Sequence, residues 1–194
     1  MTTKRADLLP IFEKFIPISE AAQDMFFSFL METTAPKGTI LLKPRQICTR
    51  LYFLKEGFAY QYRCTEKANI VTYFWFEQDF ITNLPSFLTQ IPSTETIEVL
   101  DDSILYSITY DQLQLLYQAY PEFNALGRLI LEHYYLELAN VGDLFSTYPA
   151  KSRYDKLLQQ KPQLFQQATL GQIASYLNIS QETLSRVRAQ KEIS

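Results

Sequence analysis

The stretch from Thr169 to Arg188 constrains the fold of this chain most, because its residues specify two short helices joined by a tight turn. Thr169 can accept a hydrogen bond from the first turn of one helix, and Ser180 can do the same for a second. Asn178 falls at the turn, where a left-handed backbone is usual and asparagine tolerates it. Apolar residues at helical spacing form the inner faces: Ile173, Ala174, Leu177, Leu184 and Val187. The pattern predicts a helix-turn-helix over residues 169–190, with a generic helical hairpin as the alternative.

The outward face of this predicted unit is polar and carries arginine. Arginine can bond to both major-groove acceptors of guanine, glutamate can accept from cytosine, and glutamine can pair with adenine. Side-chain hydroxyls are suited to phosphate oxygens. The residues that we expect to contact double-stranded DNA are Thr169, Ser180, Gln181, Glu182, Thr183, Ser185, Arg186 and Arg188.

Charge is spread unevenly along the 194 residues, whose formal net charge is −3. From residue 151 onward there are seven basic and three acidic side chains, a net charge of +4, which leaves −7 on residues 1–150. A basic end on an acidic body is expected when only that end of a protein meets phosphate. The charge distribution therefore agrees with a DNA partner at the C-terminal end.

Residues 39–110 contain short apolar runs separated by turn signals. The runs are Thr39–Leu42, Arg50–Leu54, Phe58–Arg63, Ile70–Phe76, Thr96–Leu100 and Ile104–Ile108. Strands of this length and spacing predict an antiparallel sandwich or barrel. Residues 6–32, which precede them, have a helical pattern.

The longest helical pattern runs from Pro121 to about residue 146, and Pro121 is suited to a first helical turn. Such a helix is roughly 35–40 Å long at 1.5 Å per residue. A small domain does not cover that length, so we expect the helix to pair with a second copy. The residues expected at this seam are Phe123, Leu126, Ile130, Tyr134, Glu137, Val141 and Leu144. The alternative is a helix that lies along its own barrel. Shorter helices are predicted at 111–119 and 150–160, and a glutamine-rich loop around 159–167.

Residue types that most enzymes and cofactor sites require are scarce. The five glycines are scattered and form no phosphate-binding loop, and His133 is the only histidine. Cys48 and Cys64 form neither a CxxC motif nor a Cys/His cluster. No apolar run approaches the roughly 18 residues of a membrane helix, and no signal peptide is evident. We therefore expect a cytoplasmic protein with no enzymatic activity, no metal, no other cofactor and no membrane partner.

The chain resembles the Crp/Fnr family of bacterial transcription regulators. The likeness is carried by Ile173–Leu177 and Ile179–Arg186. In the family, the recognition helix opens with Ser-Arg-Glu-Thr and has an arginine four residues after the glutamate. Gln181 replaces the arginine of that motif, and the other positions match: Ser180, Glu182, Thr183 and Arg186. The order of the predicted parts is also similar over nearly the whole chain.

This resemblance implies an α+β protein in which residues 1–120 form an antiparallel jelly-roll sensor domain of the cyclic-nucleotide-binding type, with N-terminal helices. Residues 121–147 would be the dimerisation helix, and residues 148–194 an all-α helix-turn-helix domain that binds DNA. It implies a homodimeric regulator with a small-molecule effector, and it admits RNA polymerase as a partner. The alternative is a ligand- or protein-binding regulatory module whose helix-turn-helix no longer binds DNA.

The chain departs from the cyclic-nucleotide-binding members of the family at the phosphate-binding cassette. Asn83 replaces the ribose-binding glutamate and Ser93 replaces the phosphate-binding arginine, while Thr82 and Thr94 flank them in the degenerate pocket. A cyclic phosphate here would lose a charge-assisted bond worth roughly 1.5–3 kcal/mol, and Glu95 would repel it. We therefore expect that cyclic AMP is not the effector. Because only six residues follow position 188, we also expect no β-hairpin wing.

Overall fold

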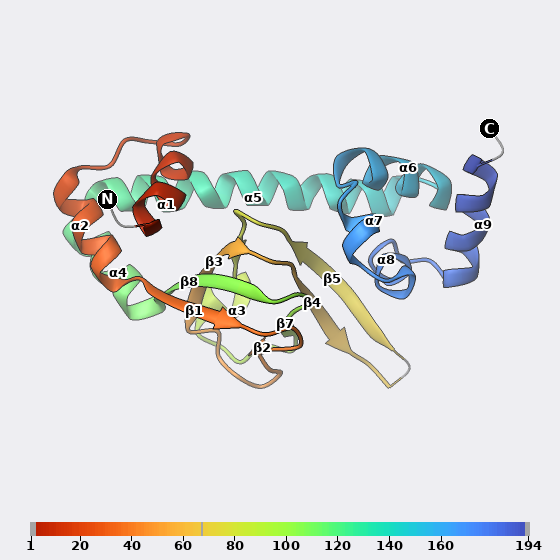
Figure 1. Ribbon diagram of the computed structural model, residues 1–194, viewed down its shortest axis with the longest axis horizontal. Coiled ribbons are helices and arrows are strands. Elements are labelled where there is room, and N and C mark those ends of the chain that lie inside the picture. Colours follow the sequence, from red (N-terminus) through yellow and green to blue (C-terminus); the bar gives the residue numbers. More distant parts are fainter. Residues whose placement is uncertain (1–2, 67, 193–194) are drawn as a thin grey trace. The chain divides into compact units, whose positions relative to one another are not determined.

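The computed structural model describes residues 3–66 and 68–192, and it divides into two compact units. The first unit contains Met1–Tyr60 and Phe74–Tyr134, and the second contains Gln61–Tyr73 and Tyr135–Ser194. Helix α5 (Pro121–Thr147) contributes residues to both units (Figure 1). Residues 61–66 and 68–73, which belong to a hairpin of two consecutive strands, group with the C-terminal helices.

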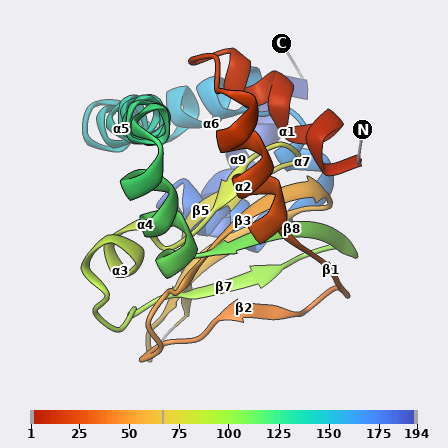
Figure 2. The same cartoon turned by 90° about the vertical axis from the view of Figure 1, so that its left-hand side faces the viewer.

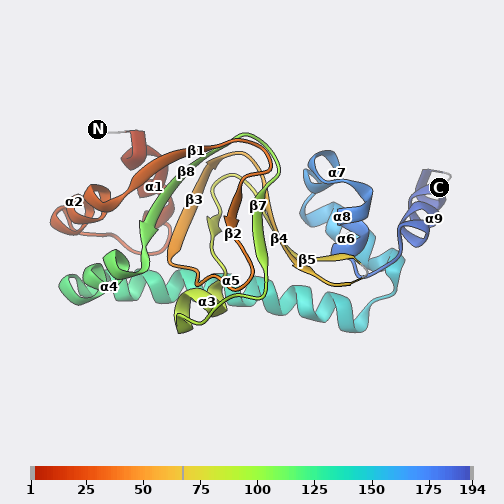
Figure 3. The same ribbon diagram turned by 90° about the horizontal axis from the view of Figure 1, so that it is seen from below.

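Eight strands form two four-stranded sheets. The first has the order β1-β8-β3-β6 and the second β2-β7-β4-β5. Pairs β1–β8, β3–β8, β3–β6 and β2–β7 are antiparallel, which confirms the predicted antiparallel sandwich. Figure 2 shows β2 and β7 side by side below β1 and β8, and Figure 3 shows the same strands from below. The strands are β1 (Met31–Ala35), β2 (Ile40–Leu42), β3 (Arg50–Glu56), β4 (Ala59–Cys64), β5 (Asn69–Trp75), β6 (Phe80–Ile81), β7 (Thr96–Val99) and β8 (Ser103–Thr109).

Aromatic residues fill much of the core of the first unit. The rings of Phe58 and Phe74 stack with their centroids 5.5 Å apart, and those of Phe53 and Tyr106 stack at 6.1 Å. Trp75 is also buried. Each of these large rings removes much apolar area from water, so they stabilise the sandwich without any cross-link.

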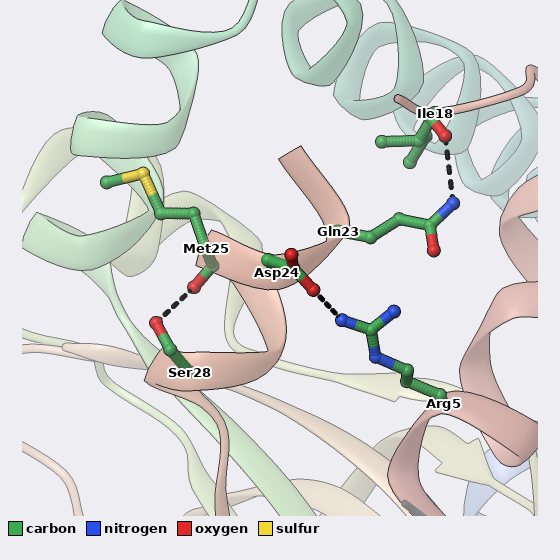
Figure 4. A network of polar contacts seen from close by, with 6 residues as sticks. All are labelled: Arg5, Ile18, Gln23, Asp24, Met25 and Ser28. Carbon is green, nitrogen blue, oxygen red and sulfur yellow. Dashed lines mark hydrogen bonds and ion pairs between the residues drawn. The ribbon is translucent and has the colours of Figure 1, made fainter. Parts of the chain in front are cut away.

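Two N-terminal helices, α1 (Thr3–Glu13) and α2 (Glu20–Phe29), are joined by side-chain contacts. Arg5 on α1 pairs with Asp24 on α2, and Gln23 Nε2 donates to the carbonyl oxygen of Ile18 at 2.8 Å (Figure 4). The hydroxyl of Ser28 donates to the carbonyl of Met25 at 2.7 Å within α2. These contacts fix the corner that connects the helices to β1.

The sequence prediction of helical structure over residues 6–32 holds for α1 and α2 and is wrong at its C-terminal end, where a strand begins. The chain leaves helical structure between α1 and α2, where Pro17 lacks a backbone donor and restricts the residue before it. It then enters β1 at Met31, which pairs with Ser107 of β8. β1 forms because it pairs with a strand that is distant in the sequence, and a local sequence pattern cannot predict such a pairing.

The sequence prediction also missed three short elements: β6, α3 (Leu84–Thr89) and α7 (Leu164–Gln167). Helix α7 lies in the segment predicted to be a glutamine-rich loop, so that prediction is wrong. Elements of two to six residues are too short to show a periodic pattern. The other predicted strands and helices begin or end within three residues of the observed bounds, and α4 covers Tyr110–Ala119.

A buried tyrosine links α1 to the first sheet. Tyr106 on β8 is fully buried, and its hydroxyl donates to Asp7 Oδ2 on α1 at 2.6 Å. Burial, followed by the hydrogen bond to Asp7, raises the pKa of Tyr106 well above its usual range. The folded protein therefore favours the protonated phenol more strongly than the unfolded chain does.

Replacing this phenol tests the link. We expect Tyr106→Phe to lower the free energy of unfolding by about 1.5–3 kcal/mol at neutral pH, because the Asp7 carboxylate loses a donor. The deficit should shrink above about pH 10, where tyrosine ionises in the unfolded wild-type chain but Tyr106 does not in the folded one. Urea unfolding measures both, with Tyr148→Phe, at an exposed tyrosine outside the proposed seam, as the matched control. A variant as stable as that control would contradict the account.

Candidate nucleic-acid interface and effector site

Four helices of the second unit surround one small core. They are α6 (Ala150–Gln160), α7, α8 (Leu170–Tyr176) and α9 (Gln181–Glu192). We call the last two, with residues 177–180 between them, the α8–α9 pair (Figure 1). The buried side chains of this core are Tyr154, Leu157, Leu164, Ile173, Ala174, Tyr176, Leu177, Leu184 and Val187. The core is close to the one that the sequence predicts.

Local hydrogen bonds define where α8 and α9 begin and how they turn. Thr169 Oγ1 accepts from the amide of Gln172 at 3.3 Å, and Gln172 Oε1 accepts from the amide of Thr169 at 2.9 Å. Ser180 Oγ accepts from the amide of Thr183 at 3.1 Å. Asn178 has a φ angle of 52°, in the left-handed region. These cap and turn roles are the ones predicted from the sequence.

The residues predicted to contact DNA lie together on the α8–α9 pair. Thr169, Ser180, Gln181, Glu182, Ser185 and Arg186 are exposed, and Thr183 and Arg188 are half-buried. The guanidinium of Arg186 lies along its own helix, with Nε 3.4 Å from the carbonyl oxygen of Glu182 and Nη2 3.5 Å from Thr183 Oγ1. Both bonds are long, so this arginine can leave them for a better partner at small energetic cost.

Two residues that the sequence prediction did not single out make contacts near the crossing of these helices. Arg153 on α6 donates from Nη1 to the carbonyl oxygen of Leu177 at 2.8 Å, at the end of α8. Its buried Nε has no hydrogen-bond partner within the described part of the chain. Gly171 approaches Gln181 so closely that a Cβ at this position would lie 2.6 Å from Gln181 Nε2. A glycine inside a short helix was the one available signal for that close approach.

In the first unit, two polar residues of the predicted effector pocket, Asn83 and Ser93, both bond to Glu95. Asn83 is 4% exposed; its Oδ1 accepts from the amide of Ser86 at 3.1 Å, and its Nδ2 donates to Glu95 Oε2 at 2.9 Å. Ser93 is also buried, and its Oγ accepts from the amide of Glu95 at 3.0 Å. Asn83 and Ser93 therefore share Glu95 as a hydrogen-bond partner, and its carboxylate adds negative charge to the pocket.

The two flanking threonines of this pocket differ in burial and contacts. Thr82 is half-buried, and its hydroxyl lies 3.4 Å from the carbonyl oxygen of Arg50 and 3.3 Å from Cys48 Sγ. Thr94 is exposed. Cys48 is buried in this region, while Cys64 is exposed on β4.

The residues predicted for the dimer seam divide into two groups on α5. Phe123 and Leu126 are each 3% exposed, and Phe123 stacks on Phe26 of α2 at 5.5 Å. Ile130 and Tyr134 are half-buried, and the Tyr134 hydroxyl accepts from the amide of Phe80 at 3.0 Å. The N-terminal part of the expected seam therefore packs within its own unit, while the side chains of Glu137, Val141 and Leu144 lie outside the described residues. Apolar side chains that are exposed on α5 are Leu131, Tyr135, Leu136 and Leu138.

Among residues 3–66 and 68–192 there is no group of three or more histidine, cysteine, aspartate or glutamate side chains that could hold a metal ion. Within the same ranges, none of the helices combines the length and the apolar character needed to cross a membrane.

Residues 32–120 match the family model of the cyclic nucleotide-binding domain. The matched segment contains all eight strands except the first residue of β1. No curated protein matches the chain in sequence. Residues 32–120 therefore have the jelly-roll fold of a cyclic nucleotide-binding domain, which confirms the predicted fold class.

Solved structures of bacterial regulators share this fold over most of the chain. FixK2 from Bradyrhizobium japonicum matches with a TM-score of 0.72 at 13% identity, over 84% of this chain and 85% of its own. CLP from Xanthomonas campestris, a c-di-GMP-responsive global regulator, matches at 0.68 and 15% identity, over 90% and 92%. A protein from Eubacterium rectale assigned to the Crp/Fnr family of transcriptional regulators matches at 0.70 and 17% identity, over 93% and 88%. At such identities the likeness establishes the fold.

Asn178 tests whether the left-handed turn fixes the α8–α9 pair. We expect Asn178→Ala to destabilise the second unit by about 1 kcal/mol, because a Cβ residue without a polar side chain disfavours this conformation. Asn178→Gly should stay within about 0.5 kcal/mol of the wild type, since glycine adopts it freely. Exchange of the Ile179 amide, which donates to the Ala174 carbonyl at 3.0 Å, reports the change. Equal effects of the two variants would show that the turn does not depend on this conformation.

Proposed function

We propose that this chain is a transcription regulator of the Crp/Fnr type that binds double-stranded DNA as a homodimer through the α8–α9 pair. The observation that carries the proposal is the exposed polar face at the start of α9, which is held by caps on both helices. In this role the α8–α9 pair is a helix-turn-helix, and α9 is its recognition helix. The protein acts by binding alone, without catalysis.

We assign recognition of the DNA base sequence to the first two turns of α9. Gln181 and Glu182 lie at the start of the helix, and Ser185 and Arg186 follow one turn later, so these side chains share the exposed end. Arg186 can bond to guanine once it leaves Glu182 and Thr183. Phosphate contacts are assigned to the hydroxyls of Thr169, Ser180 and Thr183 and to Arg188.

Dimerisation is assigned to α5. Leu131, Tyr135 and Leu138 recur at intervals of four and three residues, the spacing of one helical face. With Leu136, they are between 37% and 70% exposed. An apolar stripe of this kind is expected to be covered by the same helix of a second copy. The seam is then shifted by about one residue from the one that the sequence predicts.

The effector is proposed to be something other than cyclic AMP. A cyclic phosphate needs a cationic partner, whereas Ser93 is neutral and Asn83 already bonds to the carboxylate of Glu95. The domain is therefore assigned an effector of different chemistry. RNA polymerase as a partner and a cytoplasmic location belong to the same proposal.

The salt dependence of DNA binding separates this proposal from a module that no longer binds DNA. We expect the affinity for duplex DNA to fall steeply as salt rises, with a log–log slope of about −0.9 for each phosphate neutralised. Arg186→Ala should lose about 1–3 kcal/mol on a selected site and much less on random duplex. Arg128→Ala, an exposed arginine on α5, is the matched control and should bind as the wild type does. An affinity that does not change with salt would favour the module that no longer binds DNA. An equal loss of affinity on both duplexes would mean that Arg186 contacts only phosphate.

Calorimetry with cyclic AMP tests the effector assignment. We expect no binding in the micromolar range, because the site supplies no cation for the phosphate. Glu95→Gln removes the repulsive charge but adds no cation, so it should leave this result unchanged. Micromolar or tighter binding by the wild-type protein would contradict the assignment.

A further inference from the structure

The outer edge of strand β5 is hydrogen-bonded to helix α8 within the second unit. In its sheet β5 is the terminal strand, with β4 as its neighbour. The hydroxyl of Ser175 on α8 accepts from the amide of Val71 at 2.9 Å and donates to the carbonyl oxygen of Asn69 at 3.0 Å. One side chain therefore satisfies two backbone groups of an edge strand.

The geometry of this contact is that of a strand pair. Residues two apart in a strand direct their amide and carbonyl groups to the same side, so the free groups of Asn69 and Val71 face one partner. If another strand paired with this edge, one residue of that strand would bond to both the Asn69 carbonyl and the Val71 amide. Here the Ser175 hydroxyl does so with its single proton and a lone pair. The bonds fix α8 in register with the edge of β5.

A second contact joins the hairpin to the C-terminal helices. The ammonium of Lys161, the residue that ends α6, lies 5.4 Å from the ring centroid of Tyr73 on β5. This distance is within the range of a cation–π interaction. The hairpin therefore touches both α6 and α8, the two helices on which α9 packs most.

The hairpin itself is closed by its own hydrogen bonds. Gln61 Nε2 donates to Thr72 Oγ1 at 3.1 Å, across β4 and β5. At the turn, Thr65 Oγ1 donates to the carbonyl of Ala68 at 2.7 Å and accepts from its amide at 3.2 Å. These bonds make the hairpin a defined element that can hold a helix in place.

We propose that Ser175 is a positioning residue that couples the β4–β5 hairpin to the α8–α9 pair. Both strands of the hairpin continue in sequence into the first unit, at Tyr60 and at Phe74. A rearrangement of the effector domain that moves either strand then reaches α8 through two hydrogen bonds, and α9 through α8. This inference rests on the proposed function, because the position of α9 matters most if it reads DNA. The simpler alternative is a serine that only protects a sheet edge.

Hydrogen exchange in the DNA-free protein tests the contact. Ser175→Ala should speed exchange of the Val71 amide about five- to tenfold, because a hydrogen bond worth about 1 kcal/mol or slightly more is lost. Ser175→Thr keeps the hydroxyl and should exchange as the wild type does. Ser28→Ala, which removes a serine–carbonyl bond in α2, is the matched control and should leave Val71 unchanged. Unchanged exchange in Ser175→Ala would overturn the proposal.

A double-mutant cycle separates coupling from edge protection, also without DNA. Thr65→Ala loosens the hairpin turn and should speed exchange of the Ile179 amide in the α8–α9 pair. In a Ser175→Ala background the same change should have no further effect, because the link is already broken. Additive effects, or no effect of Thr65→Ala on Ile179, would mean that Ser175 only protects the edge, and the proposal would be wrong.

Hydrogen exchange in the presence of a DNA duplex selected for binding then tests whether the coupling between the hairpin and the α8–α9 pair serves the proposed function. By reciprocity, duplex binding should alter exchange at residues 69–73 in the wild type and in Ser175→Thr, and not in Ser175→Ala. An equal change in all three proteins would overturn the proposal. A coupled cycle in a protein that binds no duplex would leave Ser175 as a positioning residue while contradicting the proposed function.

Discussion

The close crossing of α8 and α9 is the constraint on which the proposed DNA-reading face depends. Ala174 is almost completely buried there, and its carbonyl oxygen accepts from the amide of Ile179 beyond the turn. Arg153 holds the end of α8 from outside the pair, and Gly171 lets Gln181 lie against α8. The bonds of Ala174 with Ile179 and of Arg153 with Leu177 fix backbone atoms. The angle at which α9 presents its polar end is therefore set before any DNA is bound, which lowers the entropy lost on binding.

The cyclic nucleotide-binding domain keeps its fold although the polar residues of its predicted pocket differ from the family pattern. Asn83 and Ser93 bond to Glu95 and to neighbouring backbone, so the buried polar groups are satisfied without a ligand. The sandwich is stabilised by aromatic packing, which does not require an occupied site. A sensor of this kind can change its ligand chemistry without losing stability. Such a sensor must retain a structural link between its β-sandwich and the α8–α9 pair. We propose that the hydroxyl of Ser175, on the edge of β5, provides this link.

Sequence reasoning was most successful where local chemistry decides the structure. The cap at Thr169 and the turn at Asn178 follow from side-chain hydrogen bonding and backbone preference over a few residues. It failed where distant segments decide: β1 exists because it pairs with β8, and Phe123 is buried because α2 packs on it. The contacts of Arg153 and Ser175 could not be predicted from the sequence either. A positive charge and a helical serine have many roles, and only the tertiary fold selects one.

The most direct test of the central claim is selection of duplexes by the full chain from a random library, followed by sequencing. A homodimer that reads DNA through α9 should enrich an inverted repeat whose half-sites are centred about 10–10.5 base pairs apart, one helical turn. Arg186→Ala should relax the preference at a guanine in each half-site. Enrichment of no sequence, or of a single unrepeated half-site, would contradict the account.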